Sequence, residues 1–192
     1  MRRKARKGGG RQLDVTIERI GAKGDGVAAC DGQPLFLAGA LPGEAVRALV
    51  SGKRGGGFKG RILELLETSP ERVEPPCPHF GPCGGCSLQH WAPASYRKWK
   101  TGLLVTALKH HGLTCEAVSA LRVVPPGSRR RIDLSCLRLA ERTVVGFHER
   151  GSHHIENIDT CHLLTAGLRQ SISPLHRIVA SCFEEKEKGE LV

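Results

Sequence analysis

The segment Cys77-Pro-His-Phe-Gly-Pro-Cys83-Gly-Gly-Cys86 places three cysteines within one short stretch, and a fourth candidate ligand, Cys161, follows far downstream. The glycines of Cys-Gly-Gly-Cys allow backbone N–H groups to approach the sulfur atoms, which is common around metal clusters. Prolines at 75, 76, 78 and 82 remove backbone donors and stiffen the chain around the thiols. This spacing predicts an inorganic centre held by Cys77, Cys83, Cys86 and Cys161.

Two other uses of these cysteines compete with a cluster. The chain opens Met-Arg-Arg-Lys without an apolar signal segment, so we expect a cytoplasmic protein in which disulfides are disfavoured. Structural zinc is the stronger rival because four-cysteine zinc sites also use Cys-x2-Cys turns, although they normally repeat the turn. Spacing alone leaves an iron–sulfur cluster and zinc open. The other cysteines are expected to be small core residues, namely Cys30, Cys115, Cys136 and Cys182.

The overall charge favours a polyanionic partner. Lys and Arg number 29 against 19 Asp and Glu, which gives a formal charge of +10 and a pI near 9.5. Nucleic acid is the expected partner. No apolar run approaches the roughly 20 residues that a membrane span requires. Residues 1–11 carry six basic and no acidic side chains, so we expect a disordered tail that either contacts phosphates or is simply solvated.

Residues 12–68 show a β pattern that predicts a small OB-like barrel. Leu13, Val15 and Ile17 alternate with polar residues, and Asp31-Gly32 is a hairpin signal between two short apolar runs. Residues 51–60 are expected to form a mobile, glycine-rich cationic loop between the last two of five strands. Barrels of this type commonly bind oligonucleotides, and an exposed solubilising loop is the alternative. The RNA-binding candidates here are Lys53, Arg54, Phe58, Lys59 and Arg61.

Residues 69–192 are expected to form an α+β region that carries the cluster and is incomplete at its C-terminal end. Pro93 predicts the first position of a helix that ends before Gly112. Two shorter helices are expected next, one from after Cys161 through Leu168 and one restarting at Ser173-Pro174. The expected strands are 129–136, 143–147 and 153–158. The sequence therefore predicts a mixed, mainly β fold class.

Basic residues of this second region add three RNA-binding candidates, Arg130, Arg131 and Arg150. Neighbouring side chains alternate across a strand, so at most two of the three arginines at 129–131 point the same way. No His-Glu-x-x-His, Gly-x-Ser-x-Gly or Gly-x-Gly-x-x-Gly motif occurs in a suitable context. These residues alone predict no catalytic constellation.

The order of these features resembles the RNA uracil-C5 methyltransferases of the iron–sulfur, TRAM-containing type. Ile17-Glu-Arg-Ile-Gly-Ala-Lys-Gly-Asp-Gly-Val27 and Leu41-Pro-Gly-Glu-Ala-Val46 resemble the TRAM domain, and Ser69-Pro-Glu-Arg-Val73 resembles its exit. The three-cysteine segment continues into Ser-Leu-Gln89 as in that family. The central sheet is matched by Arg130-Arg131-Ile-Asp-Leu-Ser135 and Gly146-Phe-His-Glu-Arg-Gly-Ser-His-His-Ile155, followed by Cys161.

The resemblance implies a [4Fe-4S] cluster on the four cysteines named above, RNA as partner and S-adenosylmethionine as the cofactor of the full-length protein. It covers residues 12 to about 180. Ser128 stands where the family usually has an aromatic residue. No cofactor loop, nucleophilic cysteine or general-base glutamate of the family follows, so the fold class is expected to lack an S-adenosylmethionine Rossmann-like domain.

We therefore expect the N-terminal RNA-binding and iron–sulfur portion of a 23S ribosomal RNA (uracil-C5) methyltransferase. On this interpretation the chain is inactive alone, and its methyltransferase domain is a partner in cis. The alternative is a stand-alone RNA-binding adaptor with a structural four-cysteine metal site. A glycine-rich cofactor loop downstream in the reading frame would favour the methyltransferase.

Overall fold

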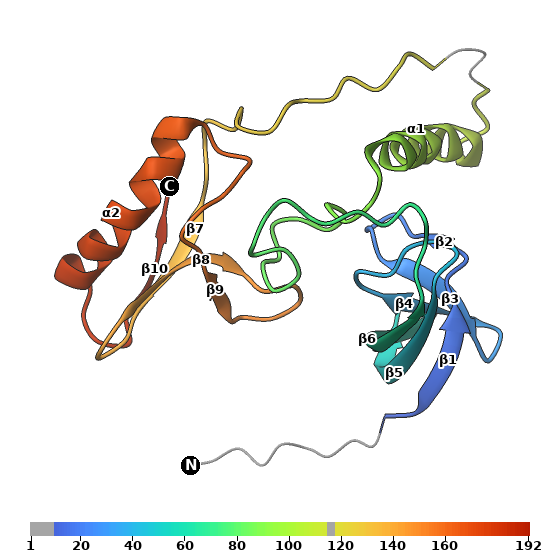
Figure 1. The fold of residues 1–192 in the computed structure, drawn as a ribbon, viewed down its shortest axis with the longest axis horizontal. Coiled ribbons are helices and arrows are strands. Elements are labelled where there is room, and N and C mark those ends of the chain that lie inside the picture. The colour runs from blue at the N-terminus through green and yellow to red at the C-terminus, as the bar shows by residue number, and fades with distance from the viewer. Residues whose placement is uncertain (1–9, 115–117) are drawn as a thin grey trace. The chain divides into compact units, whose positions relative to one another are not determined.

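The computed structural model describes residues 10–114 and 118–192, and these divide into two compact units (Figure 1). The first unit contains the chain up to Glu74 together with His90–Ser119. The second unit contains Pro75–Gln89 and Ala120–Val192. Each unit is therefore built from two separate pieces of sequence. The basic residues before position 10 lie outside the described residues.

The first unit is a six-stranded sheet in the order β1-β5-β6-β4-β3-β2. Neighbouring strands are antiparallel except for the parallel pair β4 and β6. Three register shifts between β5 and β6 bend these two long strands, because an extra residue increases local twist. The strands are β1 (Gln12–Thr16), β2 (Arg19–Ile20), β3 (Gly26–Cys30), β4 (Gln33–Leu37), β5 (Ala45–Arg54) and β6 (Gly57–Glu67).

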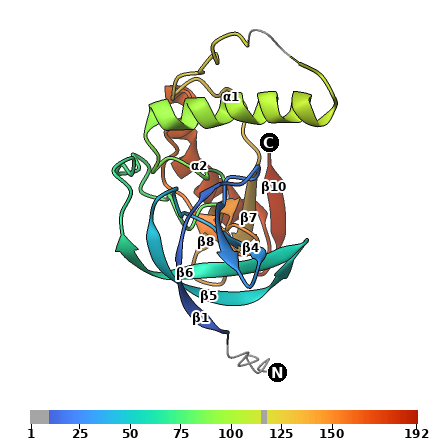
Figure 2. The same ribbon diagram turned by 90° about the vertical axis from the view of Figure 1, so that its right-hand side faces the viewer.

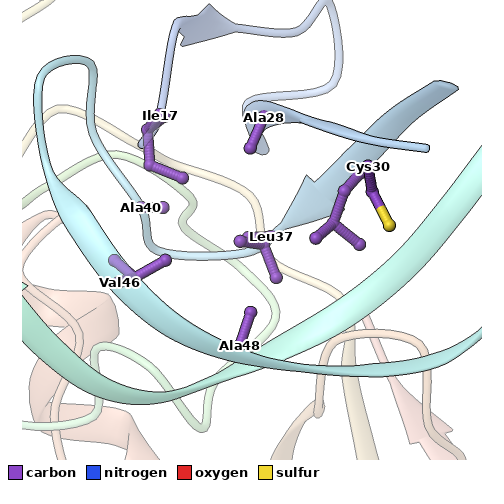
Figure 3. Close-up of a cluster of buried hydrophobic side chains, with 8 residues drawn as sticks. Ile17, Ala28, Cys30, Leu37, Ala40, Val46 and Ala48 are labelled. Atoms are coloured by element: carbon purple, nitrogen blue, oxygen red, sulfur yellow. The ribbon is translucent and has the colours of Figure 1, made fainter. Parts of the chain in front are cut away.

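The bent strands enclose a small apolar core (Figure 3). In β5 the inward positions Val46 and Ala48 are fully buried, as the alternation of side chains along a strand requires. Gly57 is necessary where β6 begins, because a Cβ atom there would collide with the backbone oxygen of Pro34. The core is formed by Ile17, Ala28, Cys30, Leu35, Leu37, Ala40, Val46 and Ala48.

The prediction of a mobile loop at residues 51–60 is wrong. Strand β5 continues to Arg54 and β6 begins at Gly57, so only Gly55 and Gly56 form the turn. Gly55 has a φ of 55°, a left-handed conformation that glycine adopts without strain. The three consecutive glycines thus permit a tight hairpin, and the basic residues lie on paired strands.

A buried ion pair joins the barrel to the chain that leaves it. The Glu44 side chain is fully buried, and its carboxylate accepts hydrogen bonds from Arg72 Nε at 2.5 Å and Nη2 at 2.7 Å. The backbone N–H of Leu41 donates a further hydrogen bond at 2.8 Å. Burial alone would raise the pKa of Glu44, but the hydrogen bonds and charge of Arg72 with the backbone donors outweigh it and lower the pKa.

We expect Glu44→Gln to lower the free energy of unfolding by about 3 kcal/mol at pH 7, because Arg72 then loses its counter-charge in a largely buried position. The folded-state pKa of Glu44 lies below its usual value of 4.5. Its contribution is therefore present above that value and is lost as pH falls through the folded-state pKa. Urea unfolding at pH 7 and at acidic pH measures both effects.

The matched control is Asp14→Asn, which removes an exposed partner of Arg47 at 2.9 Å. Exposed pairs contribute at most about 1 kcal/mol. Equal destabilisation by the two substitutions would contradict the assignment of Glu44–Arg72 as the main ionic contact of this unit.

Helix α1 (Pro93–His110) belongs to the first unit and begins where the sequence predicted, with proline in its first turn. Trp99 Nε1 donates to the backbone oxygen of Ile20, the last residue of β2, at 3.3 Å. Figure 2 shows α1 from the side as one straight helix. Glu71 accepts hydrogen bonds from Trp91 Nε1 and Ser95 Oγ at 2.9 and 2.7 Å. These contacts attach the start of α1 to the segment that leaves the barrel.

The second unit is an antiparallel four-stranded sheet in the order β10-β7-β8-β9, with α2 packed on β7 and β8 (Figure 1). Its elements are β7 (Leu134–Arg138), β8 (Thr143–His148), β9 (Ile155–Asn157), α2 (Ala166–Cys182) and β10 (Lys188–Leu191). The helix and sheet bury Leu134, Cys136, Val145, Ile158, Leu164, Ile172 and Val179 between them.

The two short helices expected after Cys161 are wrong: α2 is a single helix that contains Pro174. Ile172 and Val179 are buried on either side of the proline, so packing against the sheet offsets the lost backbone hydrogen bond. The charged segment after α2 continues the sheet, because Lys188–Leu191 pairs with β7 as β10.

The expected fold class, mainly β, is wrong as well. The described chain contains helices of 18 and 17 residues besides the two sheets, which makes it mixed α/β. Sequence propensity underestimated α2 because its proline suggested a break. Among the described residues, no helix is long and apolar enough to cross a membrane.

Candidate metal centre and nucleic-acid interface

The four cysteines predicted as ligands line one pocket of the second unit. The pocket has an empty volume of about 430 Å³, counting the part that is open to solvent. Every residue that lines it belongs to the second unit. The structure thus brings together Cys77, Cys83, Cys86 and Cys161, which the sequence separates widely.

The three-cysteine segment is held in place by short backbone hydrogen bonds. Phe80 N–H donates to the carbonyl of Cys77 at 3.1 Å, and Gly84 N–H donates to the carbonyl of His148 at 3.0 Å. A Cβ atom at Gly84 would lie 2.5 Å from the same His148 oxygen, so only glycine allows this approach to β8. Gly85 N–H points to the Cys83 sulfur at 3.5 Å, which is the close approach of backbone to thiol that the glycines predict.

The fourth cysteine lies where the chain enters α2. Leu164 N–H donates to the carbonyl of Cys161 at 3.2 Å, and Arg129 N–H donates to the carbonyl of Leu163 at 2.9 Å. Cys161 also packs against the apolar core of the unit. The segment before α2 is therefore fixed both to the core and to the strand-like chain at Arg129.

The electrostatics of the pocket disfavour isolated thiolates. Burial raises the pKa of the Cys83 thiol, and the neighbouring thiols Cys86, Cys77 and Cys161 raise it further. Burial also raises the pKa of Cys86, where Cys161 and Cys77 act in the same direction and the positive charge of Arg129 acts against it. A cationic centre among the sulfurs reverses this balance, because a metal displaces the thiol protons.

His79 connects the two cysteine-bearing segments directly. Its Nε2 lies 2.8 Å from Asp159 Oδ1, and its Nδ1 lies 3.4 Å from Glu156 Oε1. The imidazole lies between two carboxylates, and the hydrogen bond to His79 is the main cause that lowers the pKa of Asp159. Residue 79 stands between Cys77 and Cys83, while Asp159 precedes Cys161 by two positions. The sequence analysis missed His79 because its partners are 77 and 80 residues away.

We expect His79→Ala to loosen the three-cysteine segment. Each hydrogen bond to a charged group is worth about 1.5 kcal/mol, so the backbone amides of residues 80–86 should exchange roughly tenfold faster. Hydrogen-exchange mass spectrometry of that segment measures the effect. His162→Ala is the control, because His162 also lines the pocket but makes no side-chain hydrogen bond among the described residues. Unchanged exchange in His79→Ala would contradict the proposed connection.

Among the described residues, no group of three or more His, Cys, Asp or Glu side chains is close enough to hold one metal ion. Four thiolates on a single zinc ion, each at a Zn–S distance near 2.3 Å, would lie about 3.8 Å from one another. In a [4Fe-4S] cluster each thiolate binds a different iron, so the four sulfurs lie farther apart than around a single zinc ion. The four cysteines of this chain line one pocket.

The RNA-binding candidates of the first unit lie on the hairpin of β5 and β6. Lys53 is opposite Phe58, and Arg61 is opposite Leu49. Lys53, Lys59 and Arg61 are exposed, whereas Phe58 is half-buried and packs on the barrel core.

Arg54 differs from its neighbours on the hairpin. It forms an ion pair with the buried Asp25 at 2.6 Å, and its guanidinium lies 5.0 Å from the centre of the Phe36 ring. Arg54 therefore already has a structural role within the barrel, in contrast to the exposed lysines.

In the second unit, Arg130 and Arg131 are exposed just before β7, and Arg150 is exposed in the turn after β8. Arg131 lies 3.9 Å from Asp133. The sequence analysis selected these arginines and passed over Arg129, which lines the cysteine pocket. Its position in a run of three arginines gave no signal that distinguished it.

Comparisons with known proteins show which proteins the chain is similar to. Residues 6–55 match the TRAM domain family. An uncharacterized RNA methyltransferase of Rhizobium meliloti is 40% identical over 179 residues, which cover 90% of this chain and 42% of the relative. The 23S rRNA (uracil(1939)-C(5))-methyltransferase RlmD of Alkalilimnicola ehrlichii is 35% identical over 171 residues, covering 87% of this chain and 38% of that protein.

The chain is homologous to RNA uracil-C5 methyltransferases. It spans about two fifths of the length of the curated relatives it matches. A crystal structure of Pyrococcus abyssi tRNA (uracil-54, C5)-methyltransferase with S-adenosyl-L-homocysteine shares the fold, with a TM-score of 0.57 and 24% identity. That match covers 87% of this chain and 37% of the solved one.

These comparisons correct the expected fold class. The sequence analysis excluded an S-adenosylmethionine Rossmann-like domain, whereas the relatives are whole methyltransferases and the solved neighbour holds a cofactor-type ligand. That expectation rested on the absence of cofactor-binding motifs from these 192 residues. Motifs that are absent from one part of a protein do not define the fold class of the whole protein.

Proposed function

We propose that this chain forms the RNA-binding and cluster-bearing part of an S-adenosylmethionine-dependent 23S ribosomal RNA (uracil-C5) methyltransferase that acts in the cytoplasm. The proposal rests on one observation: four cysteines line a single pocket in a chain that is similar to RNA methyltransferases. S-adenosylmethionine supplies the methyl group in such enzymes. The residues of this chain bind and orient the RNA.

The direct test is the modification itself. Deletion of the gene should remove 5-methyluridine from one position of 23S ribosomal RNA, and a plasmid copy should restore it. Mass spectrometry of nuclease fragments measures the methyl group. Unchanged methylation in the deletion strain would overturn the methyltransferase assignment and would favour the RNA-binding adaptor.

The barrel supports RNA binding through charge placed on a rigid hairpin. Lys53 and Lys59 are exposed on neighbouring strands, and Arg61 lies further along β6. Amine and guanidinium groups on a fixed backbone can contact successive phosphates without losing much conformational freedom. Phe58 is packed against the core, so we assign these contacts to phosphates in preference to stacking on bases.

We expect RNA binding to weaken steeply with salt, by roughly 10³-fold between about 50 and 200 mM if about six phosphates are contacted. The double substitution Lys53→Gln/Lys59→Gln should reduce the slope of log K against log salt by about 1.4 for single-stranded RNA. Fluorescence anisotropy with a labelled 23S fragment measures both quantities.

The control for charge alone is Lys98→Gln/Lys109→Gln, which removes two exposed lysines from α1. It should leave the slope nearly unchanged. An equal loss in both double variants would mean that net charge, and not the hairpin, determines RNA binding.

The cysteine pocket supports a [4Fe-4S] cluster bound by Cys77, Cys83, Cys86 and Cys161. The four cysteines line one pocket, and Arg129 adds a positive charge that suits the net negative charge of a thiolate-bound cluster. When bound, such a cluster would join the three-cysteine segment to the chain before α2.

We expect Cys161→Ser to unfold part of the second unit, because the ligand set and the folded state depend on each other. The amides of residues 75–89 should lose hydrogen-exchange protection, and the visible absorption should fall. Cys182→Ser is the matched control, because Cys182 does not line the pocket and, contrary to the expectation that it is a core residue, is exposed at the end of α2. Retained absorption and protection in Cys161→Ser would exclude Cys161 as a ligand.

A further inference from the structure

A second, open pocket of the second unit lies between the turn that joins β7 to β8 and the C-terminal half of α2. Its empty volume is about 650 Å³, counting the part open to solvent. It shares no lining residue with the cysteine pocket. The lining residues are Arg138, Ala140, Glu141, Arg142, Thr143, His176, Arg177 and Ala180.

The charges around this pocket are strongly unbalanced. Three arginines line it, Arg138, Arg142 and Arg177, and Glu141 is the only acidic residue among the lining residues. Within the described residues, neither Arg142 nor Arg177 forms an ion pair. Like charges held close together repel one another, and an anion between them removes that repulsion.

The local fold gathers these residues. Leu139 N–H donates to the carbonyl of Arg142 at 2.8 Å, so the turn is tight, and Arg138 pairs with Thr143 across the hairpin. Arg138 donates to the carbonyl of Ala180 on α2, which fixes one guanidinium at the edge of the pocket.

The facing residues of α2 are also fixed. The Thr143 hydroxyl lies 3.3 Å from both Nδ1 and the carbonyl oxygen of His176. His176 Nε2 lies 3.4 Å from the carbonyl of Ile158 in the core segment. The helix is thus attached to β8 beside the pocket, while Arg142 and Arg177 stay exposed at its mouth.

We propose that this pocket binds a phosphate group of the RNA backbone, as a second anchor distinct from the barrel hairpin; the proposal rests on the RNA-binding function above. Guanidinium groups form paired hydrogen bonds with phosphate oxygens. The lining contains no Phe, Tyr or Trp on which a base would stack, so the contact positions the RNA without reading its sequence. The open shape suits a phosphate that belongs to a continuous strand.

The test is the double substitution Arg142→Gln/Arg177→Gln in the otherwise unchanged protein. RNA affinity at low salt should fall about tenfold, and the slope of log K against log salt should decrease by about 0.7 for each phosphate that the variant no longer binds. Thermal unfolding of the variant should match that of the wild type, because both side chains are exposed. The control is Lys98→Gln/Lys109→Gln, which removes two exposed lysines from α1 in the first unit and should leave the slope unchanged.

The outcomes separate this proposal from the proposed function. A steep wild-type salt slope that the arginine variant retains would overturn the pocket as a phosphate site and leave RNA binding intact. A wild type that does not bind RNA would overturn both. A third arm titrates inorganic phosphate while recording the Nε–H NMR signals of Arg142 and Arg177. Saturation by phosphate without any shift on addition of RNA would identify a small-anion site and contradict the RNA assignment.

Discussion

The convergence of four thiols from two distant segments is the constraint on which the second unit depends. The segment 75–89 and the remainder of that unit are separated in sequence by residues that belong to the first unit. The contacts that attach this segment to the unit include Gly84 to His148 and His79 to Asp159. Burial raises the pKa values of Cys83 and Cys86, which keeps these two thiols protonated. A metal centre would turn the four cysteines into strong ligands and would hold the segment in place.

Charge is used differently in the two units. In the barrel, the Glu44–Arg72 and Asp25–Arg54 pairs are at least partly buried and stabilise the fold, while Lys53 and Lys59 remain exposed on a rigid hairpin. In the second unit, exposed arginines gather at a pocket with little opposing charge. Arginine thus forms at least partly buried ion pairs in the barrel and an exposed basic surface in the second unit.

Local signals predicted local structure well. Proline at position 93 marked the start of α1, and Asp31-Gly32 marked the β3–β4 turn, where both residues have positive φ. Where packing outweighs propensity, the sequence misled: Pro174 lies within α2, and the glycines at 55–57 form a tight hairpin where a loop was expected. The prediction of a mainly β fold class was wrong for the same reason.

In the candidate site, too, the local sequence signals were informative and the long-range contacts could not be predicted. The spacing and the resemblance singled out four cysteines, and the structure brings them to one pocket. His79 and Arg129 were missed because their contacts depend on chain segments far away in the sequence. Spacing cannot distinguish zinc from iron, since both use cysteine turns, and the distinction depends on how far apart the sulfurs lie.

The central claim is that these thiols bind one iron–sulfur cluster, and metal analysis of anaerobically purified protein tests it most directly. Iron, zinc and acid-labile sulfide are quantified per chain on the same sample. The account predicts about four iron and about four sulfide atoms per chain with broad visible absorption. One zinc atom per chain without labile sulfide would contradict it.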